Sequence, residues 1–297
     1  MYDVVIIGSG PAGISASLYA KRRKLSVLII AKDRGALGKT EKIENYYGFA
    51  HGITGKELYE NGIKQAENLG IEIVQEEVVA LTKEEKTIIQ PKQDLQLESE
   101  EDFFEIETVN SKYQAKTVIL ATGTNRTIPN IKGIQEFEGK GISYCAICDA
   151  FFYRGKDVVV IGNGNYALHE VETLMPVVNS VTILTNGEQM IENRSIEVEI
   201  QEKKIREFRG DAKLQEIEFE DNTKQAIHGA FIAIGTASSC DLARKIGANI
   251  QNNQIVVDEN MQTTVAGLYA CGDCTGGLLQ ISKAVYEGAK AGLAVLK

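Results

Sequence analysis

Residues 2–30 read YDVVIIGSGPAGISASLYAKRRKLSVLII and decide the fold. An apolar strand is followed by a glycine turn, Gly8-Ser9-Gly10-Pro11-Ala12-Gly13, then by a helical pattern and a second apolar strand at 25–30. This order predicts a βαβ dinucleotide-binding unit. Gly8 permits the tight turn, Gly10 lets the backbone approach a pyrophosphate, and Gly13 lets the helix pack closely on the strand. We therefore expect phosphates at the N-terminus of the helix.

A second copy of this pattern begins at residue 157. A strand at 157–161 precedes the turn Gly162-Asn163-Gly164-Asn165-Tyr166-Ala167, and we expect a helix at 169–178 and a strand at 181–184. The first glycine and the second strand are 19 residues apart in both copies (27 − 8 and 181 − 162). Two such units imply two bound dinucleotides, or a duplicated fold in which one site is lost.

Composition limits the class of protein. The 297 residues carry a net charge of −9, with 43% hydrophobic and 25% charged residues, as in an ordinary globular chain of about two domains. The acidic balance argues against nucleic acid and anionic membranes as partners. No apolar run approaches the ~20 residues that span a bilayer, and the start does not resemble a signal peptide. We expect a cytoplasmic protein with reduced cysteines by default.

Between the two glycine turns, the pattern predicts a helix at 56–69 and strands within 71–120, with an acidic hairpin tip at 98–102. The glycine-rich, aromatic stretch 35–55 reads either as a loop that covers a flat ring or as an ordinary surface loop. Glycine and proline at 129–141 suggest a linker.

The cysteines form two close pairs. Cys145-Ala146-Ile147-Cys148-Asp149 has the spacing of a redox dithiol, in which a disulfide can open and close. Cys271 and Cys274 have the same spacing, so a shared zinc site and inert buried thiols are the alternatives. The 122 residues between the pairs (271 − 148 − 1) disfavour zinc, and we predict no metal site.

The run Lys21-Arg22-Arg23-Lys24 lies at the end of the first predicted helix. Its simplest role is to complement the helix dipole. The alternative is a docking patch for an acidic partner.

Several stretches, taken in order, resemble the low-molecular-weight thioredoxin reductases. Besides the two glycine turns they are Glu44-Asn45-Tyr46-Tyr47-Gly48, Ala121-Thr122-Gly123, Cys145-Ala146-Ile147-Cys148-Asp149 and Gly272-Asp273. The resemblance implies an α/β fold with two Rossmann-like (FAD/NAD(P)-binding, three-layer ββα) domains, the second inserted in the first. An FAD-binding domain would comprise residues 1–124 and 240–297, and an NAD(P)-binding-like domain with the dithiol would comprise 125–239.

The resemblance also implies an activity. Electrons would pass from a donor to FAD, then to the Cys145/Cys148 disulfide, then to thioredoxin, in a homodimer. Cys148 would face the flavin, Cys145 would attack thioredoxin, and Asp149 would act as the acid/base. The residues implied at FAD, with Asp273 on the ribityl chain, are Gly8, Gly10, Pro11, Ala12, Gly13, Asn45, Thr122, Gly123, Gly272, Asp273, Gln280 and Ile281.

The electron donor is where the sequence departs from the family. Arginines that would pair with the 2′-phosphate of NADPH are absent from 185–190, where Glu188 would repel it. NADH is possible, with Gly162, Gly164, Ala167 and Glu188 as its site. Reduced ferredoxin is the other candidate, since one branch of the family depends on it.

Two other functions compete with this prediction. One is a ferredoxin/flavodoxin–NAD(P) reductase-type flavoprotein without disulfide chemistry, which the presence of the Cys145/Cys148 pair disfavours. The other is a zinc- or nucleotide-binding regulatory protein without turnover, which stoichiometric zinc and no flavin would favour.

Overall fold

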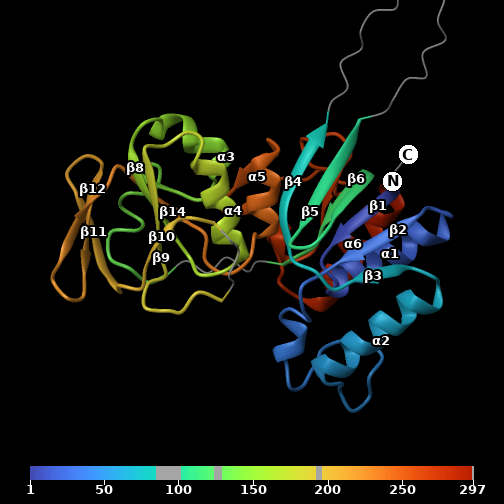
Figure 1. Ribbon diagram of the computed structural model, residues 1–297. Coiled ribbons are helices and arrows are strands. Elements are labelled where there is room, and N and C mark those ends of the chain that lie inside the picture. The colour runs from blue at the N-terminus through green and yellow to red at the C-terminus, as the bar shows by residue number, and fades with distance from the viewer. Residues whose placement is uncertain (85–101, 124–128, 192–195, 296–297) are drawn as a thin grey trace, which may run out of the picture. The chain divides into compact units, whose positions relative to one another are not determined.

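The computed structural model describes residues 1–84, 102–123, 129–191 and 196–295 (Figure 1). The chain divides into two compact units, Met1–Thr124 with Ser238–Lys297, and Asn125–Ala237. The return to the first unit thus comes two residues before the expected position 240. Each unit is built on its own sheet, with parallel strands at the position of the glycine turn, which confirms the predicted α/β fold with two nucleotide-binding domains.

The first unit contains a seven-stranded sheet in the order β3-β2-β1-β6-β5-β4, in which β17 also pairs with β6. The β1–β2, β2–β3, β1–β6 and β6–β17 pairs are parallel, whereas β4–β5 and β5–β6 are antiparallel. The strands are β1 (Tyr2–Ile7), β2 (Val27–Ile30), β3 (Glu72–Val74), β4 (Val78–Glu84), β5 (Phe103–Thr108), β6 (Lys112–Leu120) and β17 (Leu268–Ala270).

Helices and short elements complete this unit. Thr54 caps α2 with a reciprocal capping box to Glu57, and Ser238 caps α5 in the same way through Asp241. The helical elements are α1 (Pro11–Arg22), η1 (Leu37–Lys39), α2 (Gly55–Asn68), α5 (Ser239–Lys245), η3 (Asp273–Thr275) and α6 (Ile281–Ala294). A small hairpin joins β15 (Ile250–Gln251) to β16 (Gln254–Ile255).

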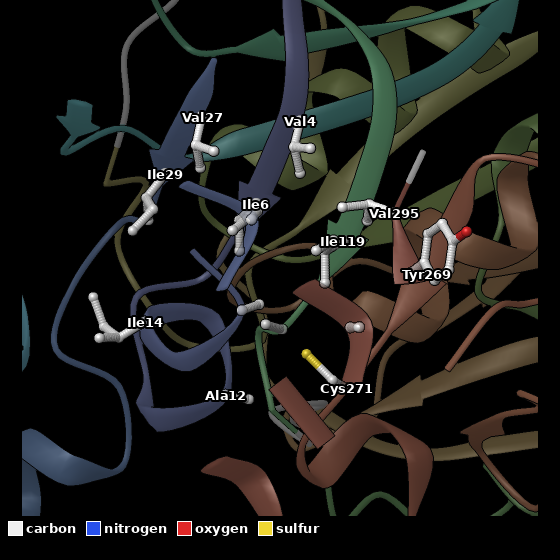
Figure 2. Close-up of a cluster of buried hydrophobic side chains, with 14 of the residues drawn as sticks. Val4, Ile6, Ala12, Ile14, Val27, Ile29, Ile119, Tyr269, Cys271 and Val295 are labelled. Carbon is white, nitrogen blue, oxygen red and sulfur yellow. The ribbon is translucent and has the colours of Figure 1, made fainter. Parts of the chain in front are cut away.

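Helices α1 and α6 pack unusually closely because glycines lie at their contact. A Cβ at Gly288 would lie 2.1 Å from the Ala12 carbonyl oxygen, and one at Gly292 would lie 2.2 Å from that of Ala16. Val4 and Ile6, alternate residues of β1, belong to the same buried cluster as Ile14 of α1 and Ala291 of α6, and Figure 2 shows the first three of them. The helix pair is therefore held in one position on the sheet by backbone contact.

The second unit repeats the parallel arrangement in the order β10-β9-β8-β14-β7. A separate antiparallel sheet has the order β11-β12-β13. The strands are β7 (Ile142–Ser143), β8 (Asp157–Ile161), β9 (Ser180–Leu184), β10 (Glu199–Gln201), β11 (Ile205–Gly210), β12 (Leu214–Phe219), β13 (Lys224–Ala226) and β14 (Gly229–Ile232). The helical elements are α3 (Ala146–Asp149), η2 (Ala150–Tyr153) and α4 (Asn165–Leu174).

Two expectations about this unit were wrong. Helix α4 begins at Asn165, four residues before the predicted 169, because Gly164 of the turn is itself the N-cap. Residues 129–141 are not a linker, since Ile131, Ile134 and Phe137 are buried in the core of the second unit. Of the predicted acidic hairpin tip, 98–101 lie outside the described residues.

Two residues of the basic run at the end of α1 donate hydrogen bonds to carbonyls at the ends of two other helices, α2 and α6. Lys21 Nζ donates to the Gly70 carbonyl 2.9 Å away, just beyond α2. Arg23 Nη1 donates to the carbonyls of Leu293 and Val295 at 2.8 and 2.6 Å, at the end of α6. Within the described residues, no helix is long and apolar enough to cross a membrane.

The α1–α6 contact yields a stability prediction. Gly288→Ala should destabilise the protein by about 1–3 kcal/mol, although alanine is the better helix former, because its Cβ would meet a backbone oxygen. Gly62→Ala in α2 is the control, since its Cβ would only touch Ile14 side-chain atoms at 3.5 Å or more. Urea unfolding monitored by circular dichroism compares the variants. Equal or greater stability of Gly288→Ala would contradict the packing argument.

Candidate active site

Three of the predicted cofactor-binding stretches follow neighbouring parallel strands of the first unit. The turn 8–13 follows β1, Thr122-Gly123 follows β6, and Gly272-Asp273 follows β17. Their proximity is direct, because a Cβ at Gly8 would lie 2.4 Å from the Ala121 carbonyl oxygen and one at Gly272 would lie 2.9 Å from the Ala12 Cβ. The carboxyl edge of a parallel sheet is the usual place for a dinucleotide.

The start of α1 fits the pyrophosphate of FAD. Gly10 is the N-cap and no side chain caps this end, Pro11 occupies the first turn, and that turn holds no acidic residue. A Cβ at Gly10 would meet nothing within 4 Å, so the backbone is open to a ligand. A Cβ at Gly13, by contrast, would lie 1.9 Å from the Gly8 carbonyl oxygen. Free N–H groups and the helix dipole at such an end favour phosphate.

Two further predicted residues meet across the sequence. Asn45, from the loop before α2, donates from Nδ2 to Gln280 Oε1 at 3.0 Å. Gln280 is the N-cap of α6, which begins at the predicted Ile281. The aromatic loop 35–55 is thereby connected to the start of α6.

Sequence reasoning missed Ser239. Its Oγ lies 2.8 Å from Thr122 Oγ1, and its backbone N–H donates to the same Thr122 oxygen at 2.9 Å. This bond joins the end of β6 to the point where the chain re-enters the first unit. The S-x-x-D capping box from Ser238 to Asp241 was the available sequence signal.

The turn that carries Asp273 is held by two charged side chains that were also missed. Gly272 and Gly276 have positive φ values of 84° and 76°. Lys283 Nζ donates to their two carbonyls, at 2.8 and 2.5 Å, and Glu287 Oε2 accepts from the Gly272 N–H at 2.9 Å. Burial raises the pKa of Asp273, and the Lys283 ammonium opposes that rise.

The predicted dithiol is a disulfide in the second unit. Cys145 and Cys148 are bonded, with Cα atoms 5.3 Å apart. Cys145 is the N-cap of α3, and its Sγ accepts the Cys148 backbone N–H at 3.2 Å. Cys145 is 1% exposed, whereas Cys148 is exposed. A sulfur that accepts an N–H at a helix start is favoured as a thiolate once the bond opens.

The predicted acid/base residue is tied to this segment. Ser143 Oγ donates to Asp149 Oδ2 at 2.6 Å and accepts the Cys145 N–H at 3.1 Å. From α4, the buried Glu170 accepts the Ala146 N–H at 2.7 Å through Oε2. The disulfide therefore lies in a segment fixed from both sides by hydrogen bonds.

The second glycine turn, at 162–167, has two of the three glycines of the first turn, but neighbouring residues bond to it. Gly162 is packed, since its Cβ would lie 2.2 Å from the Ala233 carbonyl oxygen, whereas Gly164 has room. Asn163 Nδ2 donates to the Gln189 carbonyl at 3.1 Å, and the Ile191 N–H donates to the Asn163 carbonyl at 2.8 Å.

The remaining residues of that predicted nicotinamide site, Ala167 and Glu188, differ in their exposure to solvent. Ala167 is buried in α4, and Glu188 is exposed on the loop after β9. Tyr166, in the first turn of α4, is 2% exposed and its hydroxyl lies 3.4 Å from the Tyr144 carbonyl. The first turn of this helix thus packs toward the dithiol segment.

The other cysteines are buried free thiols, namely Cys240, Cys271 and Cys274. Burial raises the pKa of Cys271 well above its usual range and that of Cys274 to about 12. Figure 2 shows Cys271 within the apolar core cluster of the first unit. Among the described residues, no group of three or more His, Cys, Asp or Glu side chains could hold a metal ion.

Comparison with known proteins agrees with this geometry. Residues 2–288 match the family model for pyridine nucleotide-disulphide oxidoreductases. The thioredoxin reductase of Aquifex aeolicus is 34% identical, covering 100% of this chain and 93% of that protein. The thioredoxin reductase of Ureaplasma parvum serovar 3 is 35% identical, covering 99% and 95%.

Two solved structures extend the comparison. The atypical thioredoxin reductase TRi from Desulfovibrio vulgaris Hildenborough has a TM-score of 0.89 at 35% identity, covering 100% of this chain and 97% of that one. A ferredoxin-flavin thioredoxin reductase from Clostridium acetobutylicum has a TM-score of 0.69 at 32% identity, covering 99% and 96%. The chain therefore belongs to the pyridine nucleotide-disulphide oxidoreductases, and within them to the low-molecular-weight thioredoxin reductases, which are FAD-dependent oxidoreductases.

Proposed function

We propose that this protein reduces the disulfide of a thioredoxin in the cytoplasm, with electrons that come from reduced ferredoxin rather than from NADPH. The Cys145–Cys148 disulfide carries the proposal, because an oxidised pair at this spacing is the group that exchanges with a protein disulfide. The turns 8–13, 122–123 and 272–273 of the first unit would hold FAD, which would supply the redox chemistry that connects the donor to the disulfide.

The two sulfurs have different tasks in this proposal. Two electrons and two protons convert the disulfide to a dithiol, and the Cys148 N–H stabilises Cys145 as a thiolate. Cys145 is 1% exposed while the disulfide is closed, so this sulfur has to become accessible after reduction. It then attacks the thioredoxin disulfide to form a mixed disulfide, and Cys148 resolves it and releases the reduced thioredoxin. Asp149, oriented by Ser143, is the group that gives and takes the proton.

A surface beside the dithiol supports a protein substrate. Phe151 and Phe152, just after α3, are 70% and 69% exposed. Arg154 lies 5.2 Å from the centre of the Phe151 ring. Exposed aromatic side chains with a neighbouring arginine are typical of the centres of protein interfaces.

Three observations on the second unit disfavour NADPH. No lysine or arginine occurs at 185–191, and the Glu188 carboxylate would repel a 2′-phosphate bound after β9. Asn163 of the glycine turn is occupied by hydrogen bonds to the loop 189–191. The same bonds count against NADH, which leaves a protein donor as the favoured candidate.

Ferredoxin has support of its own. One structural relative is described as a ferredoxin-flavin thioredoxin reductase. Because each ferredoxin cluster carries one electron, two reduced clusters are needed for each disulfide. A ferredoxin–NAD(P) reductase without disulfide chemistry is the second candidate, and the bonded cysteine pair argues against it.

We also propose a homodimer, as the family resemblance implies. Tyr286 and Leu293 are 62% and 49% exposed at seven-residue spacing on α6, and Leu279, which precedes the helix, is 53% exposed. Exposed apolar side chains on one helix face and beside its start are suited to pairing with a second copy.

Thiol counting tests the division between redox and structural cysteines. At about pH 8, the oxidised folded protein should react with almost no thiol reagent, because burial keeps Cys271 and Cys274 protonated. Unfolding should expose the three free thiols, and mild reduction of the folded protein should instead make Cys145 and Cys148 reactive. Rapid labelling of Cys271 or Cys274 in the folded oxidised protein would contradict this division.

Anaerobic titration identifies the donor. Reduced ferredoxin should bleach the flavin absorbance and, in its presence, sustain thioredoxin reduction, whereas NADPH and NADH should do neither. Lys203→Ala, which removes a charge on the second unit outside both glycine turns, is a control for surface charge. It should respond to each donor as the wild type does. Bleaching at comparable rates by NADPH would overturn the donor proposal and leave the disulfide chemistry intact.

A further inference from the structure

The turn that carries Asp273 is positioned by a pair of charged side chains inside the first unit. The side chains of Lys283 and Glu287 are only 14% and 13% exposed, and their charged atoms lie 3.0 Å apart. An ion pair this far from water is costly unless its hydrogen-bonding capacity is used. Here the capacity is used on one short segment, Gly272–Gly276.

Lys283 donates hydrogen bonds to oxygen atoms of the segment. Its ammonium donates to Gly272 O, Gly276 O and Thr275 Oγ1, at 2.8, 2.5 and 2.9 Å. Three acceptors saturate the three donors of an ammonium group. The bonds tie the beginning and the end of the segment to the same atom.

Glu287 accepts hydrogen bonds from the same segment. Its Oε2 accepts the Gly272 N–H at 2.9 Å and the Thr275 hydroxyl at 2.8 Å. Both members of the ion pair therefore bond to residues on either side of Asp273, which is itself half-buried and senses their charges.

The helix that carries the pair is a rigid support. Gly288 follows Glu287 and lies in backbone contact with Ala12 of α1, where a Cβ would be 2.1 Å from the carbonyl oxygen. Helix α1 begins at the turn that fits the pyrophosphate. The ion pair thus fixes the Asp273 segment in register with the phosphate end of the site.

We propose that Lys283 and Glu287 are positioning residues that fix Asp273 for the ribityl chain of FAD. The inference rests on the proposed role of Asp273. Without the ion pair, the segment Gly272–Gly276 would no longer be held in one conformation. Asp273 would then lose its contact with the ribityl chain, while the phosphate site at Gly10 would be unchanged. The adenosine diphosphate half and the flavin half of the cofactor should therefore respond differently when the pair is removed.

The test compares FAD and ADP binding to the full chain stripped of flavin. In Lys283→Met/Glu287→Met, which leaves no unpaired buried charge, FAD should bind about tenfold more weakly or worse, while ADP affinity stays within about twofold. The control is Lys290→Met, because Lys290 lies on the same helix over the Tyr286 ring and should change neither affinity. Thermal unfolding checks that each variant is folded.

The outcomes separate the inference from its premise. Unchanged FAD affinity in the double variant, or an equal loss for FAD and ADP, overturns the inference. If Lys283→Met alone fails to fold, the double variant still decides, and the single variant Glu287→Gln gives a second measurement of the same FAD-to-ADP ratio. If Asp273→Ala binds FAD like the wild type, the ribityl role of Asp273 is wrong and the inference falls with it.

Discussion

The backbone contact between α1 and α6 is the constraint on which the first unit depends. Without side chains at Gly288 and Gly292, the two helices approach until carbonyl oxygens of α1 occupy the space that a Cβ atom on α6 would need. This contact places the start of α6, with Gln280, and the glycine turn before α1 at the same edge of the sheet. Because glycine loses more chain entropy on folding than other residues, its use inside a helix has to be offset by this packing.

The dithiol depends on a more local constraint. Cys145 and Cys148 are separated by one turn of helix, so their sulfurs meet wherever that turn forms. What the surroundings add is chemistry, through the bonds of Ser143 and Glu170 to backbone and carboxylate groups of this segment. In the second unit, therefore, the nucleotide-type helix α4 contributes a buried carboxylate to the redox segment.

Short motifs predicted much of the site, and distant contacts could not be predicted. The turn 8–13, the cysteine pair and Gly272-Asp273 each carry their chemistry within a few neighbouring residues. The bond between Asn45 and Gln280 joins residues 235 positions apart, and no local pattern signals it. The early start of α4 was missed, although Gly164 repeats the N-cap role of Gly10. Residues 129–141 were wrongly predicted to be a linker, because the prediction relied on their glycines and proline. It did not consider that Ile131, Ile134 and Phe137 could be buried in the core.

The central claim is that reducing equivalents leave the flavin only through the Cys145–Cys148 pair. The most direct measurement photoreduces the flavin without any donor, adds oxidised thioredoxin anaerobically, and counts the thiols that appear on thioredoxin. The wild type and a Cys240→Ser control should each generate reduced thioredoxin, and Cys148→Ser should generate none although its flavin is equally reduced. Transfer by Cys148→Ser at the wild-type rate would contradict the account.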